Sequence, residues 1–413
     1  MTDIISLSAL LLAIFIGIIR PKVNIGVVSI VFALIIGILI LGIKEKEVTS
    51  LFPSNLFLML VGITLFFGIA STNGSLSKLT DSLISRVGGK TKLLPISIFV
   101  LTFVLSAIGP GNIAATLLIA PVAMQLSAKS NISPFLMAIM VATGANAGAF
   151  SPVAPTGVVS TGLIQKIGVM DIDLPLKIFI GTAIIQSLSA MLAYVAFKGY
   201  LSSKSIDIVH KVEKFTRKDK ITVFSILLLV FSVIVLKLPI TVVAFGLAIV
   251  LLIFNVGDSE KTIKQIPWDA ILLVTGVTVL IGVMEKGGGL DLATDLIAKI
   301  ASVDNINGIL SITTGVISAY SSSSGVVMPA FIPLIPSIIE KIGGGNITEM
   351  LIAVNVGSHM VDVSPLSTLG AICIATAQID QVEKGKLFRN LMIWGLAMAV
   401  FGSLVIYVLL DLL

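Results

Sequence analysis

Gly144-Ala-Asn-Ala-Gly-Ala-Phe-Ser-Pro-Val-Ala-Pro-Thr-Gly157 interrupts one apolar stretch of this chain, and Gly357-Ser-His-Met-Val-Asp-Val-Ser-Pro-Leu-Ser-Thr-Leu-Gly370 interrupts another. Both segments combine Gly and Pro, which break helices, with hydroxyl and amide side chains. In a membrane protein, a pair of such interruptions at corresponding places is the best sequence pointer to a binding site built from broken helices. The two segments therefore predict the fold and the position of the site together.

The composition identifies a membrane protein. Hydrophobic residues make up 56% of the 413 residues and charged residues only 12%, whereas soluble domains carry roughly 25% charged residues. The net charge of +5 does not indicate a nucleic-acid partner, because the basic residues lie in loops between apolar segments. The expected surroundings are a lipid bilayer. The single cysteine, Cys373, excludes an intramolecular disulfide and a cysteine-based metal site.

Matching residues in the two halves indicate a duplication. Shared Gly, Pro, Thr and Asp in one order are much harder to obtain by chance than shared Leu or Ile, so the halves are interpreted as repeats. At nearly constant spacing, Gly62, Thr64, Gly68, Gly74, Asp81, Gly144, Ser151, Pro152 and Gly157 recur as Gly276, Thr278, Gly282, Gly288, Asp295, Gly357, Ser364, Pro365 and Gly370.

An odd number of spans in each half requires the second half to be inserted upside down. Each half also contains two short apolar arms, at 93–108 and 113–127 and at 306–320 and 326–339. Arms of about 14 to 16 residues reach roughly 21 to 24 Å, less than the hydrocarbon core of about 30 Å. The prediction is an all-α polytopic membrane protein with two inverted-topology repeats. Each repeat has about five transmembrane helices and one re-entrant helical hairpin.

The distribution of basic residues predicts the orientation. With the amino terminus outside, most of the 27 Lys and Arg residues fall on the inside, as the positive-inside rule requires. The basic segment 198–220 is then a cytoplasmic linker between the repeats. The expected location is the cell membrane, as a multi-pass protein.

Two hairpin tips and two broken spans are expected to converge near the middle of the membrane. Amide groups at helix amino termini suit anions, while unwound carbonyls and helix carboxyl ends suit Na⁺. The candidate substrate-binding residues are Asn112, Thr116, Ser151, Pro152, Thr156, Ser323, Ser324, Ser364, Pro365 and Thr368. The candidate coupling-ion residues, which are also the candidate Na⁺ ligands, are Gly109, Asn112, Gly144, Asn146, Ser321, Ser324, Gly357, His359 and Asp362.

His359 and Asp362 are the clear ionisable groups within the apolar segments, and both lie in the second interruption. Such groups are functional candidates by default. Asp362 is expected to bind Na⁺ or to carry a proton, and His359 to titrate with it or contact a carboxylate. No Lys or Arg falls deep in an apolar segment. An anionic substrate is therefore expected to be held by helix dipoles, amides, hydroxyls and a co-bound cation.

At these hairpins and broken spans the sequence resembles the ion transporter superfamily, which includes the divalent anion/Na⁺ symporters, arsenite pumps and citrate carriers. Those symporters carry Ser-Asn-Thr at each hairpin tip. Here Gly111-Asn112-Ile113 matches the motif at its Asn, and Ser323-Ser324-Gly325 matches it at its first Ser. The first half, especially Gly144 to Gly162, is more similar to the MatC-type dicarboxylate (malonate) carriers.

The resemblance implies an elevator-type secondary carrier, commonly a homodimer. It divides the first repeat, 1–200, into a scaffold at 1–90 and a transport part at 91–200. It divides the second repeat, 221–413, into a scaffold at 221–302 and a transport part at 303–413. Residues 201–220 form the cytoplasmic basic linker between the repeats.

The expected function is secondary active transport of a small organic anion, a dicarboxylate such as malonate or succinate, coupled to Na⁺ or H⁺. A cation/proton antiporter on the same scaffold is the nearest alternative, because Asp362 alone could alternate between Na⁺ and H⁺. A channel is a weaker alternative, because two opposed hairpins suit alternating access better than an open pore. No enzyme activity is expected, because His-rich, Cys-rich and paired-carboxylate clusters are missing from the sequence. No cofactor other than Na⁺ is expected.

Overall fold

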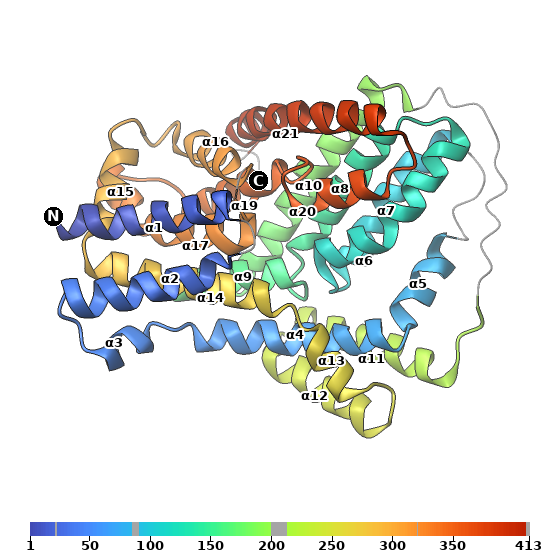
Figure 1. The fold of residues 1–413 in the computed structure, drawn as a ribbon, viewed down its shortest axis with the longest axis horizontal. Helices are drawn as coiled ribbons and strands as arrows, with labels where there is room; N and C mark the ends of the chain where they lie inside the picture. Colours follow the sequence, from blue (N-terminus) through green and yellow to red (C-terminus); the bar gives the residue numbers. More distant parts are fainter. Residues whose placement is uncertain (21–22, 85–90, 200–212, 320, 410–413) are drawn as a thin grey trace.

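The chain forms a bundle of helices (Figure 1), described in a computed structural model over residues 1–20, 23–84, 91–199, 213–319 and 321–409. Within these ranges no strand occurs. The predicted all-helical, multi-pass membrane architecture is confirmed. In the described part of the chain, six helices are long and apolar enough to cross a membrane: Ser54–Thr72, Gly111–Ser130, Leu174–Ala196, Trp268–Lys286, Ser323–Ile342 and Gln381–Val408.

The helical elements divide between the two halves of the chain. The first half contains α1 (Thr2–Ile19), α2 (Ile25–Leu34), η1 (Ile35–Ile40), α3 (Glu45–Ser50), α4 (Ser54–Thr72), α5 (Ser75–Ile84), η2 (Thr91–Leu93), α6 (Leu94–Ala107), α7 (Gly111–Ser130), α8 (Pro134–Ala149), α9 (Pro155–Lys166) and α10 (Leu174–Ala196). The second half contains α11 (Arg217–Ile234), α12 (Ile240–Ile253), α13 (Ser259–Gln265), α14 (Trp268–Lys286), α15 (Gly289–Ala298), α16 (Ile306–Ser318), η4 (Ser323–Val327), α17 (Met328–Phe331), η5 (Ile332–Leu334), α18 (Ile335–Ile342), α19 (Ile347–Met360), α20 (Thr368–Thr376) and α21 (Gln381–Leu409). Of the predicted linker 201–220, residues 201–212 lie outside the described residues.

The second arm of each hairpin is longer than the sequence predicts. Helix α7 has 20 residues, and η4 to α18 run as one apolar helix of 20 residues. At 1.5 Å per residue each measures about 30 Å, enough to cross the hydrocarbon core. The prediction of short second arms at 113–127 and 326–339 was therefore wrong. Polar residues at the ends of these arms, such as Asn112, belong to the helix although they lie outside the apolar run.

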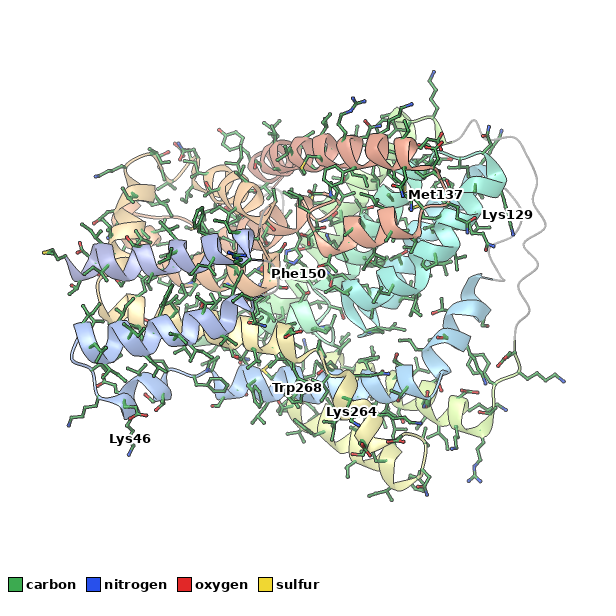
Figure 2. All side chains as sticks on the ribbon, viewed as in Figure 1. Lys46, Lys129, Met137, Phe150, Lys264 and Trp268 are labelled. Atoms are coloured by element: carbon green, nitrogen blue, oxygen red, sulfur yellow. The ribbon has the colours of Figure 1, made fainter. Side chains whose placement is uncertain are left out.

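Both predicted interruptions are present. Helix α8 ends at Ala149 and α9 begins at Pro155, while α19 ends at Met360 and α20 begins at Thr368. Proline favours the first turn of a helix because it has no N–H to satisfy there, which explains why α9 begins at Pro155. Helix α20 is capped instead by the Ser367 hydroxyl, which accepts a hydrogen bond from Gly370 N at 3.4 Å. Figure 2 places Phe150, the first residue after α8, near the middle of the molecule.

Helices of one half pack against helices of the other. Helix α2 packs along α14, and α4 packs along α12. A Cβ added to Gly276 would lie 2.1 Å from the Gly26 carbonyl oxygen, so these two backbones touch. Small residues allow such close helix crossings in membranes. In Figure 1, α6 and α7 lie to the right of centre and α16 and α17 to the left.

A buried polar cluster joins α5 to α11 outside the spans. The carboxylate of Asp219, 2% exposed, accepts hydrogen bonds from Ser75 Oγ at 2.8 Å and Lys78 Nζ at 3.1 Å. It also accepts bonds from the Thr216 backbone N at 2.8 Å and Oγ1 at 2.7 Å. Burial alone raises the pKa of Asp219, but these donors outweigh burial and hold the pKa at about 2. Asp219 therefore links the first turn of α5 to the first turn of α11.

Asp219→Asn is expected to lower the stability of the purified protein by about 1–2 kcal/mol at neutral pH. The carboxylate contributes stability that is fully present above the unfolded pKa of about 3.9 and is lost as pH falls towards about 2. Thermal unfolding of wild type and variant between pH 3 and 7 measures the difference, which should shrink at the acid end. The control is Asp173→Asn, because Asp173 pairs with Lys237 at 3.1 Å while 68% exposed and should change stability little. Equal effects of both substitutions would contradict this role of Asp219.

Candidate functional site

One chain of hydrogen bonds connects the two hairpins and the two broken spans. Asn112, in the first turn of α7, donates from Nδ2 to Asn146 Oδ1 at 3.0 Å. Asn146, near the end of α8, donates from Nδ2 to Asp362 Oδ2 at 3.4 Å. Ser323, which begins the second arm of the other hairpin, donates to Asp362 Oδ1 at 2.6 Å. Both hairpins and both broken spans therefore meet at a single carboxylate.

The surroundings of Asp362 are neutral. Its side chain is 7% exposed, and in the described part of the chain no Lys or Arg forms an ion pair with it. The Ser323 hydroxyl is itself within 2.5 Å of Ser318 Oγ, and the Ser367 hydroxyl donates to the Asp362 carbonyl. A buried carboxylate among neutral hydrogen-bonding groups requires a proton or a bound cation to balance its charge.

His359 takes part mainly through its backbone. Its carbonyl accepts hydrogen bonds from Asn146 Nδ2 at 2.9 Å and Gln186 Nε2 at 3.3 Å. The imidazole Nδ1 lies 2.9 Å from Ser358 Oγ and 3.0 Å from the Asn355 carbonyl, both on its own helix. The ring packs edge-on against Phe150, with centroids 4.7 Å apart. The His359 ring thus closes the end of α19, while its carbonyl joins the network.

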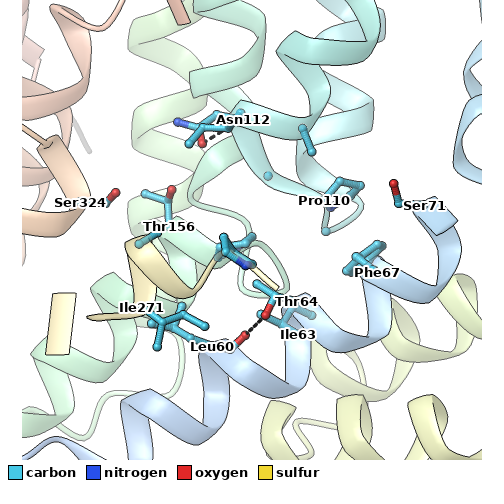
Figure 3. A pocket seen from close by; sticks show the side chains of 18 of the residues that line it. Leu60, Ile63, Thr64, Phe67, Ser71, Pro110, Asn112, Thr156, Ile271 and Ser324 are labelled. Atoms are coloured by element: carbon cyan, nitrogen blue, oxygen red, sulfur yellow. Dashed lines mark hydrogen bonds between the residues drawn. The ribbon is translucent and has the colours of Figure 1, made fainter. Parts of the chain in front are cut away.

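A cavity of about 340 Å³ lies beside this network (Figure 3). Asn112, Thr156 and Ser324 line it from the two hairpin tips and the first broken span, and α4 and α14 line its other side. The amino termini of α7 and α9 open at this cavity, because Gly111, Asn112, Pro155 and Thr156 are among its lining residues. Helix amino termini carry partial positive charge and free N–H groups, which favour anions. No Lys, Arg, Asp or Glu is among the lining residues.

Apart from Gly109, the other candidate residues do not line this cavity. Ser151, Ser364 and Pro365 are buried in the two interruptions, and Thr368 is exposed. Pro152 lines a second cavity, of about 360 Å³, beside the loop that joins α9 to α10. The remaining hydroxyl groups, Thr116 Oγ1 and Ser321 Oγ, are buried without a hydrogen-bond partner.

The three candidate glycines occupy positions of close packing. A Cβ at Gly144 would lie 2.5 Å from the Phe99 carbonyl oxygen, and one at Gly357 would lie 2.4 Å from the Ser311 carbonyl oxygen. These glycines seat each broken span against the first arm of its own hairpin. At Gly109 (φ 131°) an added Cβ would lie 2.1 Å from the Phe67 ring on α4. The first hairpin tip therefore rests directly against α4.

The structure adds two residues that the sequence did not single out. Gln186 on α10, 1% exposed, donates to the His359 carbonyl, and Ser318 extends the network beyond Ser323. A polar Gln in the middle of an apolar span was an available signal for the first. Ser318 lies among the apolar residues of a hairpin arm, where single Ser residues commonly serve packing. Among the described residues, no group of three or more His, Cys, Asp or Glu could hold a metal ion.

The chain is similar to known transporters. Residues 1–149 match the model of the family described as dicarboxylate carrier protein MatC N-terminus. No curated protein matches the chain. The crystal structure of the Alcanivorax borkumensis YdaH transporter, described as having an unusual topology, is similar with a TM-score of 0.61. The two share 14% sequence identity over 89% of this chain and 87% of that one. The resemblance to MatC-type dicarboxylate carriers is thus confirmed over residues 1–149, in a chain that has the fold of a membrane transporter.

Proposed function

We propose that this protein is a secondary active transporter of a small organic anion, a dicarboxylate such as malonate or succinate, coupled to Na⁺ or H⁺. The observation that carries the proposal is the position of the cavity. Asn112 and Ser324 line it, and Asn112 and Ser323 belong to the hydrogen-bond network around Asp362. An anion in the cavity and a cation at Asp362 would therefore stabilise each other across a short distance.

The anion site would rely on backbone dipoles. The amino termini of α7 and α9 supply N–H groups, and Asn112, Thr156 and Ser324 supply neutral side chains. Without a Lys or Arg in the lining, a bound cation would compensate part of the anion's charge. Such a site gives tight anion binding only when the cation is present, which is the requirement for coupled transport.

The cation would be held by oxygen atoms. Asp362 Oδ1 and Oδ2, Ser323 Oγ and Asn146 Oδ1 lie along the same network. These are hard ligands of the kind that suit an alkali cation, and the carboxylate alone would suit a proton. The remaining coupling-ion candidates, Gly109, Gly144, Ser321, Ser324, Gly357 and His359, belong to the two hairpin tips and the two interruptions.

The movement proposed is an elevator movement of two inverted repeats, 1–200 and 221–413. The scaffold would comprise 1–90 and 221–302, and the transport parts 91–200 and 303–413 would carry the site. The cavity supports this division, because α4 and α14 form one of its sides and the hairpin tips the other. We further propose a homodimer in the cell membrane, with the amino terminus outside and the linker 201–220 in the cytoplasm.

Proteoliposome uptake tests the proposal. With the purified full chain reconstituted, labelled malonate or succinate should accumulate under an inward Na⁺ or H⁺ gradient, saturate, and show counterflow. A cation/proton antiporter is the second candidate, because Asp362 without a counter-charge could exchange Na⁺ for H⁺ by itself. Na⁺/H⁺ exchange that requires no anion would support that candidate and contradict the first. Uptake that does not saturate would contradict both carriers and indicate a channel.

A further inference from the structure

The cavity has two chemically different sides. Figure 3 shows Asn112, Thr156 and Ser324 on one side and Leu60, Ile63 and Ile271 on the other. The first side belongs to the hairpin tips and α9, and the second to α4 and α14. Phe67 and Val274 continue the apolar surface. Apolar residues of α7 and α9, such as Ile113 and Val159, also line the first side. A substrate in this cavity therefore meets a few polar groups on the first side and mainly hydrocarbon elsewhere.

The wall formed by α4 and α14 also contains polar residues, but none of them offers a free hydrogen-bond donor in the middle of this wall. Thr64 donates its hydroxyl hydrogen to the Leu60 carbonyl at 2.7 Å, so this hydrogen is already used within α4. Ser71 and Gln265 also line the cavity, but both are exposed. Polar groups that remain available to a ligand thus lie at the hairpin side and at the exposed positions of Ser71 and Gln265, with apolar side chains between them.

Malonate fits this arrangement poorly. It has one methylene group between two carboxylates, so it would place charged oxygen atoms beside Ile63, Phe67 or Val274 wherever it sits against α4 and α14. Leaving a charged group beside apolar side chains costs free energy, whereas burying methylene groups there gains it. A cavity of about 340 Å³ is also within the range of sites that enclose larger ligands, roughly 300 to 1,000 Å³.

We infer that the preferred substrate is a dicarboxylate with an apolar body, either a chain of four or more methylenes or a chain with an alkyl or aryl substituent. This inference rests on the proposed function. One carboxylate binds at Asn112, Thr156 and Ser324, the hydrocarbon lies along α4 and α14, and the second carboxylate extends towards Ser71 and Gln265. Residues Ile63, Phe67, Ile271 and Val274 then determine specificity without contacting a charged group.

A chain-length series tests the inference. Calorimetry measures the binding of malonate, glutarate, adipate and pimelate to the purified full chain. One series contains 100 mM NaCl, and a second series is carried out at acidic pH. Affinity should increase about three- to fourfold per added methylene up to adipate. Phenylsuccinate should bind more tightly than succinate. Malonate binding as tightly as adipate would overturn the inference and leave the transporter proposal standing. Failure of every dicarboxylate to bind or be transported would overturn both.

Matched variants locate the effect at the cavity wall. Val274 lines the cavity, whereas Val277, one turn further along α14, is buried and does not. Val274→Thr should reduce the gain per methylene and narrow the difference between adipate and malonate. Val277→Thr makes the same change to the same helix and should leave the slope of the series as in wild type. An unchanged slope in Val274→Thr would contradict the assignment of this wall.

Discussion

Asp362→Asn is expected to abolish cation-driven uptake of the anion, with a loss of about 100-fold or more. The substitution keeps the shape of the side chain and removes its charge. A charge-assisted contact of about 3 kcal/mol corresponds to roughly a 100-fold change in affinity for the cation. Because Asp362 is the only carboxylate in the network described above, no neighbouring group replaces it. Uptake in proteoliposomes under Na⁺ and H⁺ gradients measures the effect.

The variant should remain folded. In the wild type, Asp362 accepts hydrogen bonds from Ser323 at 2.6 Å and from Asn146 at 3.4 Å. An Asn at this position can still accept a hydrogen bond from Ser323 and form one with Asn146. Its thermal unfolding should therefore stay close to that of wild type. Asp304→Asn, at an exposed carboxylate before α16, is the control and should transport normally. Gradient-driven uptake by Asp362→Asn at the wild-type rate would refute the assignment of the coupling site.

Gly370→Ala and Gly157→Ala are each expected to destabilise the protein strongly. A Cβ at Gly370 would lie 2.1 Å from the Ser364 carbonyl oxygen, and one at Gly157 would lie 2.1 Å from the Ser151 carbonyl oxygen. In both places the chain folds back over the interruption, so the contact is with backbone that no rotamer change can move. We expect each variant to lose about 3 kcal/mol of stability or more, measured by thermal unfolding and by the yield of folded protein.

Gly308→Ala provides the matched control. Gly308 lies inside α16, and an added Cβ there has no neighbour within 4 Å. The same substitution should therefore be neutral or stabilising by about 0.5–1 kcal/mol, because Ala favours a helix more than Gly does. Normal stability of both Gly157→Ala and Gly370→Ala would show that the interruptions are less tightly folded than the contacts indicate.

Much of the fold could be predicted because its main determinants are local. The spans are long apolar runs, and the breaks at Phe150 and Val361 occur where Gly and Pro accumulate. The lengths of the second hairpin arms were underestimated because a hydropathy boundary marks where polar side chains begin, even when those side chains face protein. Half of the Gly111–Ser130 window is buried inside the protein, where Asn112 and Thr116 are compatible with a helix that spans a membrane.

The composition of the site was harder to predict because it depends on contacts between the halves. Alignment of the repeats pairs Asn146 with His359, yet the Asn146 amide also reaches Asp362. The sequence pattern indicates these three residues as candidates, but no periodicity specifies which of them form hydrogen bonds with one another. The apolar side of the cavity was missed because the residues of α4 and α14 that line it look like ordinary span residues. Only their position opposite the hairpin tips distinguishes them.

The position of Asp362 also bears on why one chain carries both halves. At the spacing of the matching Gly, Ser and Pro residues, the position in the first half that corresponds to Asp362 is Ala149. The amide partner of Asp362, Asn146, comes from the other half. Two identical subunits assembled around the same centre would bring in either two carboxylates or none. Two like charges so close together in a poorly solvated place would oppose each other's ionisation. A single chain with two different halves is free of this constraint, since Ala149 can occupy one half and Asp362 the other, and a single negative charge is kept.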